Sequence, residues 1–295
     1  MAEVGLPGGR VASYEVIGSG RPTLMFAGGP GFTAASFMNG DAELLSGTLR
    51  CYLIDPHGSG SSTPPADPAD YSPEGHARFY DQVRQALGLP EVVVLGHSFG
   101  GTTALTYAAL FPQSTQVCVA VAAFGVGTEA DALEGGGAEA EVETLLLRHA
   151  DSPWYAAARP VMDEWTQRML AATEDAEMEQ MMAAVLPFYL AEPDQPEVAA
   201  RLAEMSRGMN ANLAAGQAWE GGLYQSVDLR PLLGRIQCPT LVVAGELDFI
   251  CGPAQARPIA AAIAGSRLVM LPGCGHFPSI EAPREYRDAV LGFLG

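Results

Sequence analysis

Lysine is missing from this sequence of 295 residues, and all 16 of its basic side chains are arginines. Without a lysine nitrogen the protein cannot form a Schiff base with pyridoxal phosphate or follow a class I aldolase mechanism. A Walker-type phosphate-binding loop also needs a lysine that contacts the nucleotide phosphates. These classes of function are therefore excluded.

Basic residues are scarce overall, because the 16 arginines face 34 aspartates and glutamates and leave a formal net charge of −18. Nucleic acids and anionic lipid surfaces bind to clustered cations, which this composition does not supply. We therefore expect no nucleic-acid partner and no membrane contact. Most of the acidic side chains are expected to form a solvated surface.

The sequence also lacks a long apolar run and a paired cysteine motif. Residues 1–7 do not begin a signal peptide, and no segment reaches the roughly 20 apolar residues of a membrane-spanning helix. The 5 cysteines are widely spaced and include no C-x-x-C pair, which is typical of reduced thiols. We predict a cytoplasmic protein without a disulfide framework or a zinc site.

What the sequence does contain is an alternation of short apolar strands with helical stretches. The segments 73–87 and 102–110 have helical character, and each lies between two apolar strands. This order is typical of an α/β fold, in which a mostly parallel central sheet is flanked by helices. The predicted strands are 24–26, 51–54, 92–95, 117–123, 240–244 and 267–271, and a final helix is predicted at 282–294.

The middle of the sequence changes in character. Residues 125–227 are rich in Ala, Glu, Met and Leu and are interrupted by prolines, which predicts an inserted helical cap. Residues 1–124 and 228–295 then form the core domain. A methionine-rich run around Met178 and Met182 either packs between cap and sheet or lines an apolar pocket.

The first chemical motif is Gly96-His97-Ser98-Phe99-Gly100, a G-x-S-x-G element between a β-branched strand and an Ala-rich helix. In this setting the serine lies on a sharp strand-to-helix turn that exposes its hydroxyl above the sheet. Glycines two residues to either side let the strand and the helix approach closely. We predict that Ser98 is a nucleophile.

A serine nucleophile needs a base, and the base needs an acid that orients it. Asp248 follows one predicted strand and His276 follows the next, so both lie at the edge of the sheet where such folds place ligands. We predict Asp248 as the acid in preference to Glu246. His276 is predicted as the base in preference to the remaining histidines, which are His57, His76, His97 and His149.

Negative charge that develops on a substrate oxygen needs preorganised N–H donors. The backbone amide of Phe99 directly follows the nucleophile. The amide of Gly29 lies in the glycine-rich turn 28–31, after the first predicted strand. We predict that these two amides form an oxyanion hole.

Five segments of the sequence together resemble the α/β-hydrolase fold superfamily. Within it, the Gly-Gly-Pro-Gly turn is similar to that of the proline iminopeptidase subfamily. The resemblance covers residues 20–125 and 228–295 well, and the cap only by its position and helical character. The segments that carry it are 27–32, 55–62, 96–101, 245–248 and 275–278.

The resemblance implies a serine hydrolase without cofactor or metal, which removes an N-terminal residue from small peptides or amides through an acyl-enzyme. Cap glutamates bind the substrate amine in the iminopeptidases, and Glu204 and Glu220 are the candidates here. A carboxylic ester or lactone hydrolase is the alternative, because Ala27, His57 and Phe99 replace the His, Arg and Trp of the subfamily pattern. A catalytically silent ligand-binding protein is the third interpretation, and the oligomeric state is left open.

Overall fold

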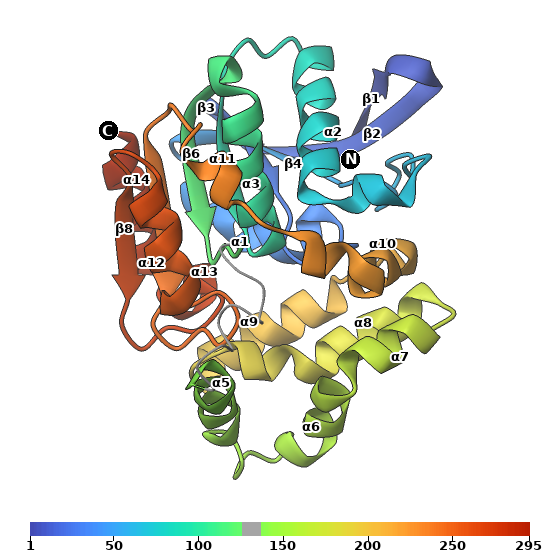
Figure 1. Ribbon diagram of the computed structural model, residues 1–295, viewed down its shortest axis with the longest axis vertical. Helices are drawn as coiled ribbons and strands as arrows, with labels where there is room; N and C mark the ends of the chain where they lie inside the picture. The colour runs from blue at the N-terminus through green and yellow to red at the C-terminus, as the bar shows by residue number, and fades with distance from the viewer. Residues whose placement is uncertain (126–136) are drawn as a thin grey trace.

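The computed structural model describes residues 1–125 and 137–295, which build a central sheet, helices on both of its faces and a group of inserted helices (Figure 1). The described strands form one eight-stranded sheet in the order β1-β2-β4-β3-β5-β6-β7-β8. Strand β2 pairs antiparallel with both β1 and β4, and the later pairs are parallel. The strands are β1 (Ala2–Leu6), β2 (Arg10–Gly18), β3 (Arg21–Phe26), β4 (Leu49–Ile54), β5 (Val92–His97), β6 (Thr115–Val121), β7 (Thr240–Gly245) and β8 (Arg267–Leu271).

Two hydrophobic layers cover the sheet because successive side chains of a strand point to opposite faces. Leu24 and Phe26 of β3 pack in the layer of α2, α3, α11 and α12, whereas Met25 packs in the layer of α1 and α14. Strands β5 and β7 are buried along their whole length, which explains their uninterrupted apolar sequences. The helices are α1 (Ala34–Leu45), α2 (Pro73–Ala86), α3 (Phe99–Leu110), α11 (Arg230–Leu233), α12 (Pro253–Ala262), α13 (Pro278–Glu281) and α14 (Pro283–Leu294).

Between β6 and β7 the chain forms a helical insertion. In Figure 1 it lies below the sheet, on the side to which β6 and β8 point. It shares a hydrophobic cluster with Phe32, Phe37 and Phe277, and Met178 and Met182 are buried in that cluster, so these methionines pack the core of the insertion. Its helices are α5 (Gly137–Leu147), α6 (Tyr155–Asp163), α7 (Trp165–Ala171), α8 (Asp175–Val185), α9 (Pro196–Arg207) and α10 (Leu213–Ala218).

The predicted α/β fold with a mostly parallel sheet is confirmed, and each predicted strand overlaps an observed one. The prediction missed β1, β2, α1 and α12. Strand β1 lies at the exposed edge of the sheet, where an apolar pattern is weak. The division into a core and a cap at 125–227 stays a prediction, and residues 126–136 of it lie outside the described part. None of the described helices is both long and apolar enough to cross a membrane.

A buried hydrogen bond joins α1 to α14. Tyr286 Oη donates to Asp41 Oδ1 over 2.5 Å, and Asp41 is only 2% exposed. Burial raises the pKa of Asp41 to about 6, and the bond from Tyr286 opposes this only in part. In the unfolded chain the pKa of an aspartate is about 3.9, so the folded state loses stability as the pH rises from about 4 through about 6.

We expect Asp41→Asn to remove this pH dependence. Asparagine keeps an oxygen acceptor for Tyr286 but cannot ionise, so the variant should gain about 3 kcal/mol over the native protein between about pH 4 and about pH 8. Urea unfolding at both pH values measures the difference. Glu43→Gln, which changes an exposed carboxyl on the same helix, is the control. If Asp41→Asn and the native protein showed the same pH dependence of stability, that dependence would not come from Asp41.

Candidate active site

Ser98 occupies the turn between β5 and α3 with a backbone conformation that side chains rarely adopt, at φ 56° and ψ −121°. The turn can be this tight because the flanking glycines have no side chain. A Cβ on Gly96 would meet Gly100 O at 2.0 Å, and a Cβ on Gly100 would meet Phe26 O at 2.0 Å. Ser98 N donates to Val121 O over 2.9 Å, and the Ser98 side chain is partly exposed. The strand-turn-helix setting predicted for this serine is therefore observed.

Asp248 and His276 form a buried pair at the carboxyl ends of β7 and β8. The Nδ1 atom of His276 donates to Asp248 Oδ2 over 2.8 Å, and Asp248 Oδ1 accepts from the amides of Ile250 and Cys251. Burial alone would raise the pKa of Asp248, but the His276 ring and the two amides hold it below its usual value. The charged carboxylate keeps the His276 proton on Nδ1, which leaves Nε2 free to accept another proton.

The alternative acid, Glu246, does not contact His276. Its side chain is exposed and accepts from Gly273 N over 3.3 Å. Of the two carboxylates considered for the acid, only Asp248 therefore has the geometry to orient the imidazole.

Cys251 lies beside the Asp248–His276 pair. Its Sγ is within 4.8 Å of a ligand atom of each member of that pair. Among the described residues, Ser98 Oγ makes no hydrogen bond to the His276 ring. Catalytic hydrogen bonds of this kind are often loose until a substrate binds.

Thiol, carboxylate and imidazole are all possible metal ligands, and Asp248, Cys251 and His276 bring one of each together. Burial raises the pKa of the Cys251 thiol well above its usual value, whereas a metal requires the thiolate. The Nδ1 atom of His276 is already bonded to Asp248. The cluster is therefore better suited to proton transfer than to metal binding.

The predicted oxyanion turn lies against the nucleophile. A Cβ on Gly28 would be 3.4 Å from Ser98 Cβ and 2.7 Å from His97 Nδ1, and Gly29 has a φ of 61°. Phe99 is the first residue of α3, so its amide has no acceptor within the helix. The amide of Gly29 likewise donates to no acceptor in the part of the chain that the structure describes. Both predicted amides thus belong to segments that contact Ser98.

The remaining histidines have other environments. Burial lowers the pKa of His57 to about 4 and those of His76 and His97 to about 3, so all three are neutral near pH 7. His97 Nε2 donates to the carbonyl of His276 over 2.8 Å, and the two rings lie 4.7 Å apart. His149 belongs to the insertion and hydrogen-bonds to an arginine. Only His276 has an aspartate on one ring nitrogen among the five histidines, all of which the structure describes.

Of the two glutamates predicted to bind substrate, Glu220 lies on the side of the insertion that faces the site. It belongs to a π-helical turn (Trp219–Leu223), and the Trp219 ring packs 5.0 Å from the Phe99 ring. Its carboxylate accepts from Trp165 Nε1 over 3.0 Å and from Thr166 Oγ1 over 2.6 Å, and both donors belong to α7.

Tyr189 lies beside His276, and the sequence did not single it out for this position. Its ring is 5.3 Å from the His276 ring. Burial raises the pKa of Tyr189, and the charges of Cys251, Asp248 and Glu220 raise it further.

Glu204 has a different environment from Glu220. It is exposed on α9 and pairs with Arg201 over 3.4 Å at the surface of the insertion. The described contacts therefore connect Glu220, but not Glu204, to the site.

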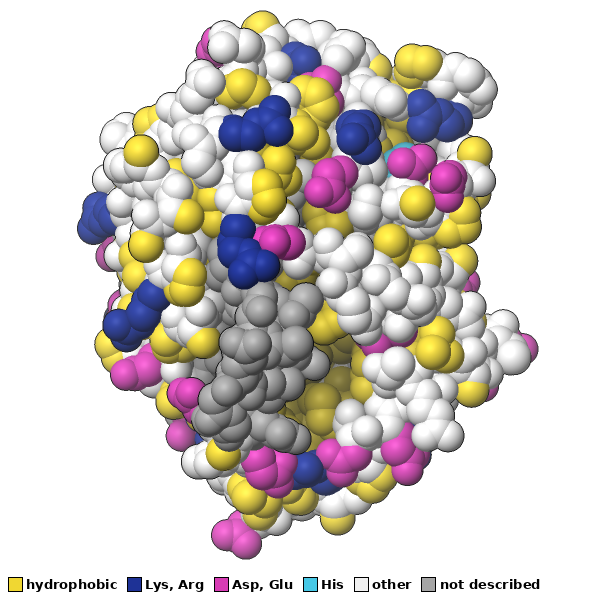
Figure 2. Space-filling view, viewed as in Figure 1, with side chains coloured by type: hydrophobic (Ala, Val, Ile, Leu, Met, Phe, Trp, Pro, Cys, Tyr) yellow, Lys and Arg dark blue, Asp and Glu magenta, His cyan; other side chains and the backbone are white. Residues whose placement is uncertain are grey.

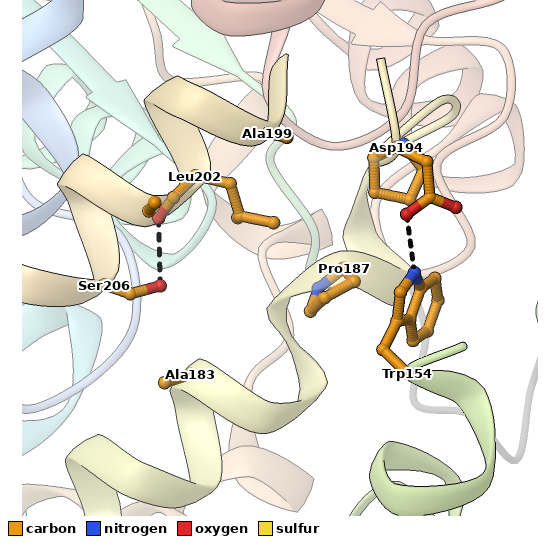
Figure 3. Close-up of a pocket in the computed structure, with 9 residues that line it drawn as sticks. Trp154, Ala183, Pro187, Asp194, Ala199, Leu202 and Ser206 are labelled. Carbon is orange, nitrogen blue, oxygen red and sulfur yellow. Dashed lines mark hydrogen bonds between the residues drawn. The ribbon is translucent and has the colours of Figure 1, made fainter. Parts of the chain in front are cut away.

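The pocket drawn in Figure 3 is separate from this site. It has a volume of about 240 Å³, and its lining residues all belong to the insertion, including Trp154, whose Nε1 donates to Asp194 Oδ1 over 3.1 Å. None of the predicted site residues lines it. Figure 2 shows another hollow, in the lower half of the view, with hydrophobic side chains in its floor.

Comparisons with known proteins identify the fold family of the chain. A family model described as alpha/beta hydrolase fold matches residues 22–283. A proline iminopeptidase of Lactobacillus delbrueckii subsp. lactis is 25% identical over 98% of this chain and 96% of its own. A 2-hydroxy-6-oxononadienedioate/2-hydroxy-6-oxononatrienedioate hydrolase of Klebsiella pneumoniae is 25% identical over 97% of this chain and 92% of its own. The structure of an enol-lactonase from Burkholderia xenovorans has a TM-score of 0.71 at 21% identity and 99% coverage of both chains, a likeness of fold.

The strained backbone of Ser98 should affect the stability of variants at this position. Ser98→Gly should be more stable than Ser98→Ala by about 1 kcal/mol, because relief of roughly 1–3 kcal/mol of strain exceeds the extra entropy that glycine loses on folding. Both variants lack the hydroxyl, so the pair isolates the backbone contribution in urea unfolding. An alanine variant of equal or greater stability would show that the turn is not strained.

Proposed function

The chain belongs to the alpha/beta hydrolase fold family, and we propose that it is a serine hydrolase with Ser98, His276 and Asp248 as its catalytic triad. Ser98 Oγ attacks the carbonyl carbon of the substrate while His276 Nε2 takes its proton. The same proton then passes to the departing amine or alcohol, which leaves an acyl-enzyme. Water, deprotonated by His276, releases the acid. The observation that carries this proposal is the hydrogen bond between Asp248 and His276 at the sheet edge where Ser98 is exposed.

The oxyanion of each tetrahedral intermediate would bind to the amides of Gly29 and Phe99. Both donors are backbone groups fixed by the turns around Ser98, so little reorganisation is needed when the charge develops. Asp248 stabilises the imidazolium that forms on His276 in the same step.

For the substrate, we propose a small peptide or amide with a free N-terminal amine, in the manner of the proline iminopeptidases. Residues 125–227 would act as a helical cap over the site and carry the amine-binding group. Glu220 supports this proposal, because it is partly buried and forms no salt bridge within the described residues, so a substrate ammonium would be its first ionic partner.

A carboxylic ester or lactone hydrolase is the second candidate. Both oxygens of Glu220 already accept hydrogen bonds from α7, so an ammonium would have to share or displace these donors. The Trp219 ring beside Glu220 packs against the Phe99 and Phe124 rings, and these apolar surroundings would suit an uncharged ester better.

The triad is tested by Ser98→Ala. We expect kcat/KM of this variant to fall at least about 10³-fold on any substrate that the native protein turns over, because the loss of one triad member removes most of the catalytic power. A fluorophosphonate probe should label the native protein and not the variant, with the adduct mapped to Ser98 by mass spectrometry. Labelling that persists in Ser98→Ala, or full turnover without the hydroxyl, would refute the mechanism. A native protein that is neither labelled nor active would support the silent ligand-binding interpretation.

The amine anchor is tested by Glu220→Gln, with a prolyl arylamide, its N-acetylated twin and a simple aryl ester as substrates. Loss of a charge-assisted hydrogen bond is worth about 1.5–3 kcal/mol, so kcat/KM for the free amine should fall about 10- to 100-fold. The acetylated amide and the ester should change by less than about threefold.

Two further variants complete the comparison. Glu204→Gln tests the second predicted glutamate, and Glu197→Gln, an exposed position on the same helix, is the control. A larger loss in Glu204→Gln than in Glu220→Gln would move the anchor to α9. If the native protein turned over the ester alone, the peptidase would be ruled out and the protein would be an esterase or lactonase.

A further inference from the structure

One carboxylate holds the backbone on both sides of His276. Glu281, the last residue of α13, accepts from Gly275 N at Oε2 over 3.0 Å and from Phe277 N at Oε1 over 3.1 Å. These two amides belong to the neighbours of the histidine. One side chain therefore holds the backbone amides of both neighbours of His276, and it makes no hydrogen bond to the imidazole.

The same carboxylate also holds the insertion. Glu281 Oε2 accepts from Ala191 N over 2.6 Å, and His276 N donates to Tyr189 O over 2.7 Å. The approach is close, because a Cβ on Gly275 would lie 2.5 Å from Tyr189 O and 3.1 Å from Glu281 Oε1. Residues 189–191 thus lie directly on the loop that carries the histidine.

Arg148, at the end of α5, holds the same segment from its other side. Its Nη2 donates to the carbonyls of Leu190 and Ala191 over 3.1 and 2.6 Å. Glu281 itself forms no salt bridge within the described residues, and its backbone donors are the three amides. Two hydrogen bonds therefore connect the insertion to the histidine loop, one from Ala191 N to the Glu281 carboxylate and one from His276 N to Tyr189 O.

We propose that Glu281 is a positioning residue that couples the helical insertion to His276 and holds the imidazole in line with Asp248. This inference rests on the proposed function, because it concerns the placement of the proposed base. Three amide donors need two acceptor oxygens in one plane, which a carboxylate offers and a carboxamide does not. A misplacement of about 1 Å in a catalytic group can cost about 10²-fold in rate.

Glu281→Gln is the decisive variant. Its carboxamide keeps one oxygen but turns an NH₂ group toward amides that need acceptors, so the loop should shift. We expect kcat per active site, counted by fluorophosphonate titration, to fall about 10- to 100-fold with KM within about threefold of the native value. The downfield proton resonance of His276 Nδ1–H, shared with Asp248, should shift or broaden. A residue that only stabilises the fold would lower the melting temperature and leave both readouts unchanged.

Two other variants keep the test informative. Glu285→Gln, an exposed carboxyl four residues further along, is the matched control and should behave as the native protein. Arg148→Met releases the segment 189–191 without altering the histidine loop. It should lower kcat in the same way, and less than additively in the double variant with Glu281→Gln. If Glu281→Gln does not fold, Arg148→Met alone tests the proposal, and an unchanged kcat in that variant would overturn it.

The outcomes separate this inference from the proposed function. A native protein that is not labelled at Ser98 would refute the serine hydrolase, while the Nδ1–H resonance would still report whether Glu281 places His276. A labelled, active native protein whose kcat and resonance are the same in Glu281→Gln would overturn the positioning role and leave the triad intact.

Discussion

The close approach of β5 to α3 is the constraint on which the site depends. Gly96 and Gly100 leave no space for a Cβ, so the chain reverses within one residue and Ser98 takes its strained conformation. The same turn makes Phe99 the first residue of a helix, with an amide that needs an acceptor. The same turn therefore positions both the proposed nucleophile and one of the proposed oxyanion donors. A side chain at either glycine would separate strand and helix and displace both groups together.

The sequence was most informative where chemistry directly follows a strand. Ser98, Asp248 and His276 each come within a few residues of an apolar run, and parallel strands bring their carboxyl ends to one edge. A pattern along the chain therefore becomes proximity in space, and both the α/β fold and the Asp248–His276 contact could be predicted. Strand β1 was missed for the opposite reason, since an exposed edge strand carries little apolar signal.

Contacts between the insertion and the sheet could not be predicted, because they depend on which face of each helix turns inward. Glu204 and Glu220 have equivalent sequence support, yet one is exposed beside an arginine and the other lies on a π-helical turn next to an aromatic cluster. Tyr189 and Glu281 are far apart in the sequence and meet only across the loop of His276. Neither belongs to a local motif, so only the folded chain brings them together.

Backbone amides hold several carboxylates of this molecule, whereas the buried Asp81 pairs with Arg84 over 2.8 Å. Asp248 and Glu281 each accept from two or more amides, and Asp55 accepts from the amide at the start of α1. These donors are fixed by the fold and are buried, so salt screens them little. Glu220 differs, because its donors are two side chains of α7. Side chains can rotate away where backbone amides cannot, so the proposed substrate amine would displace the donors of Glu220 more easily than those amides.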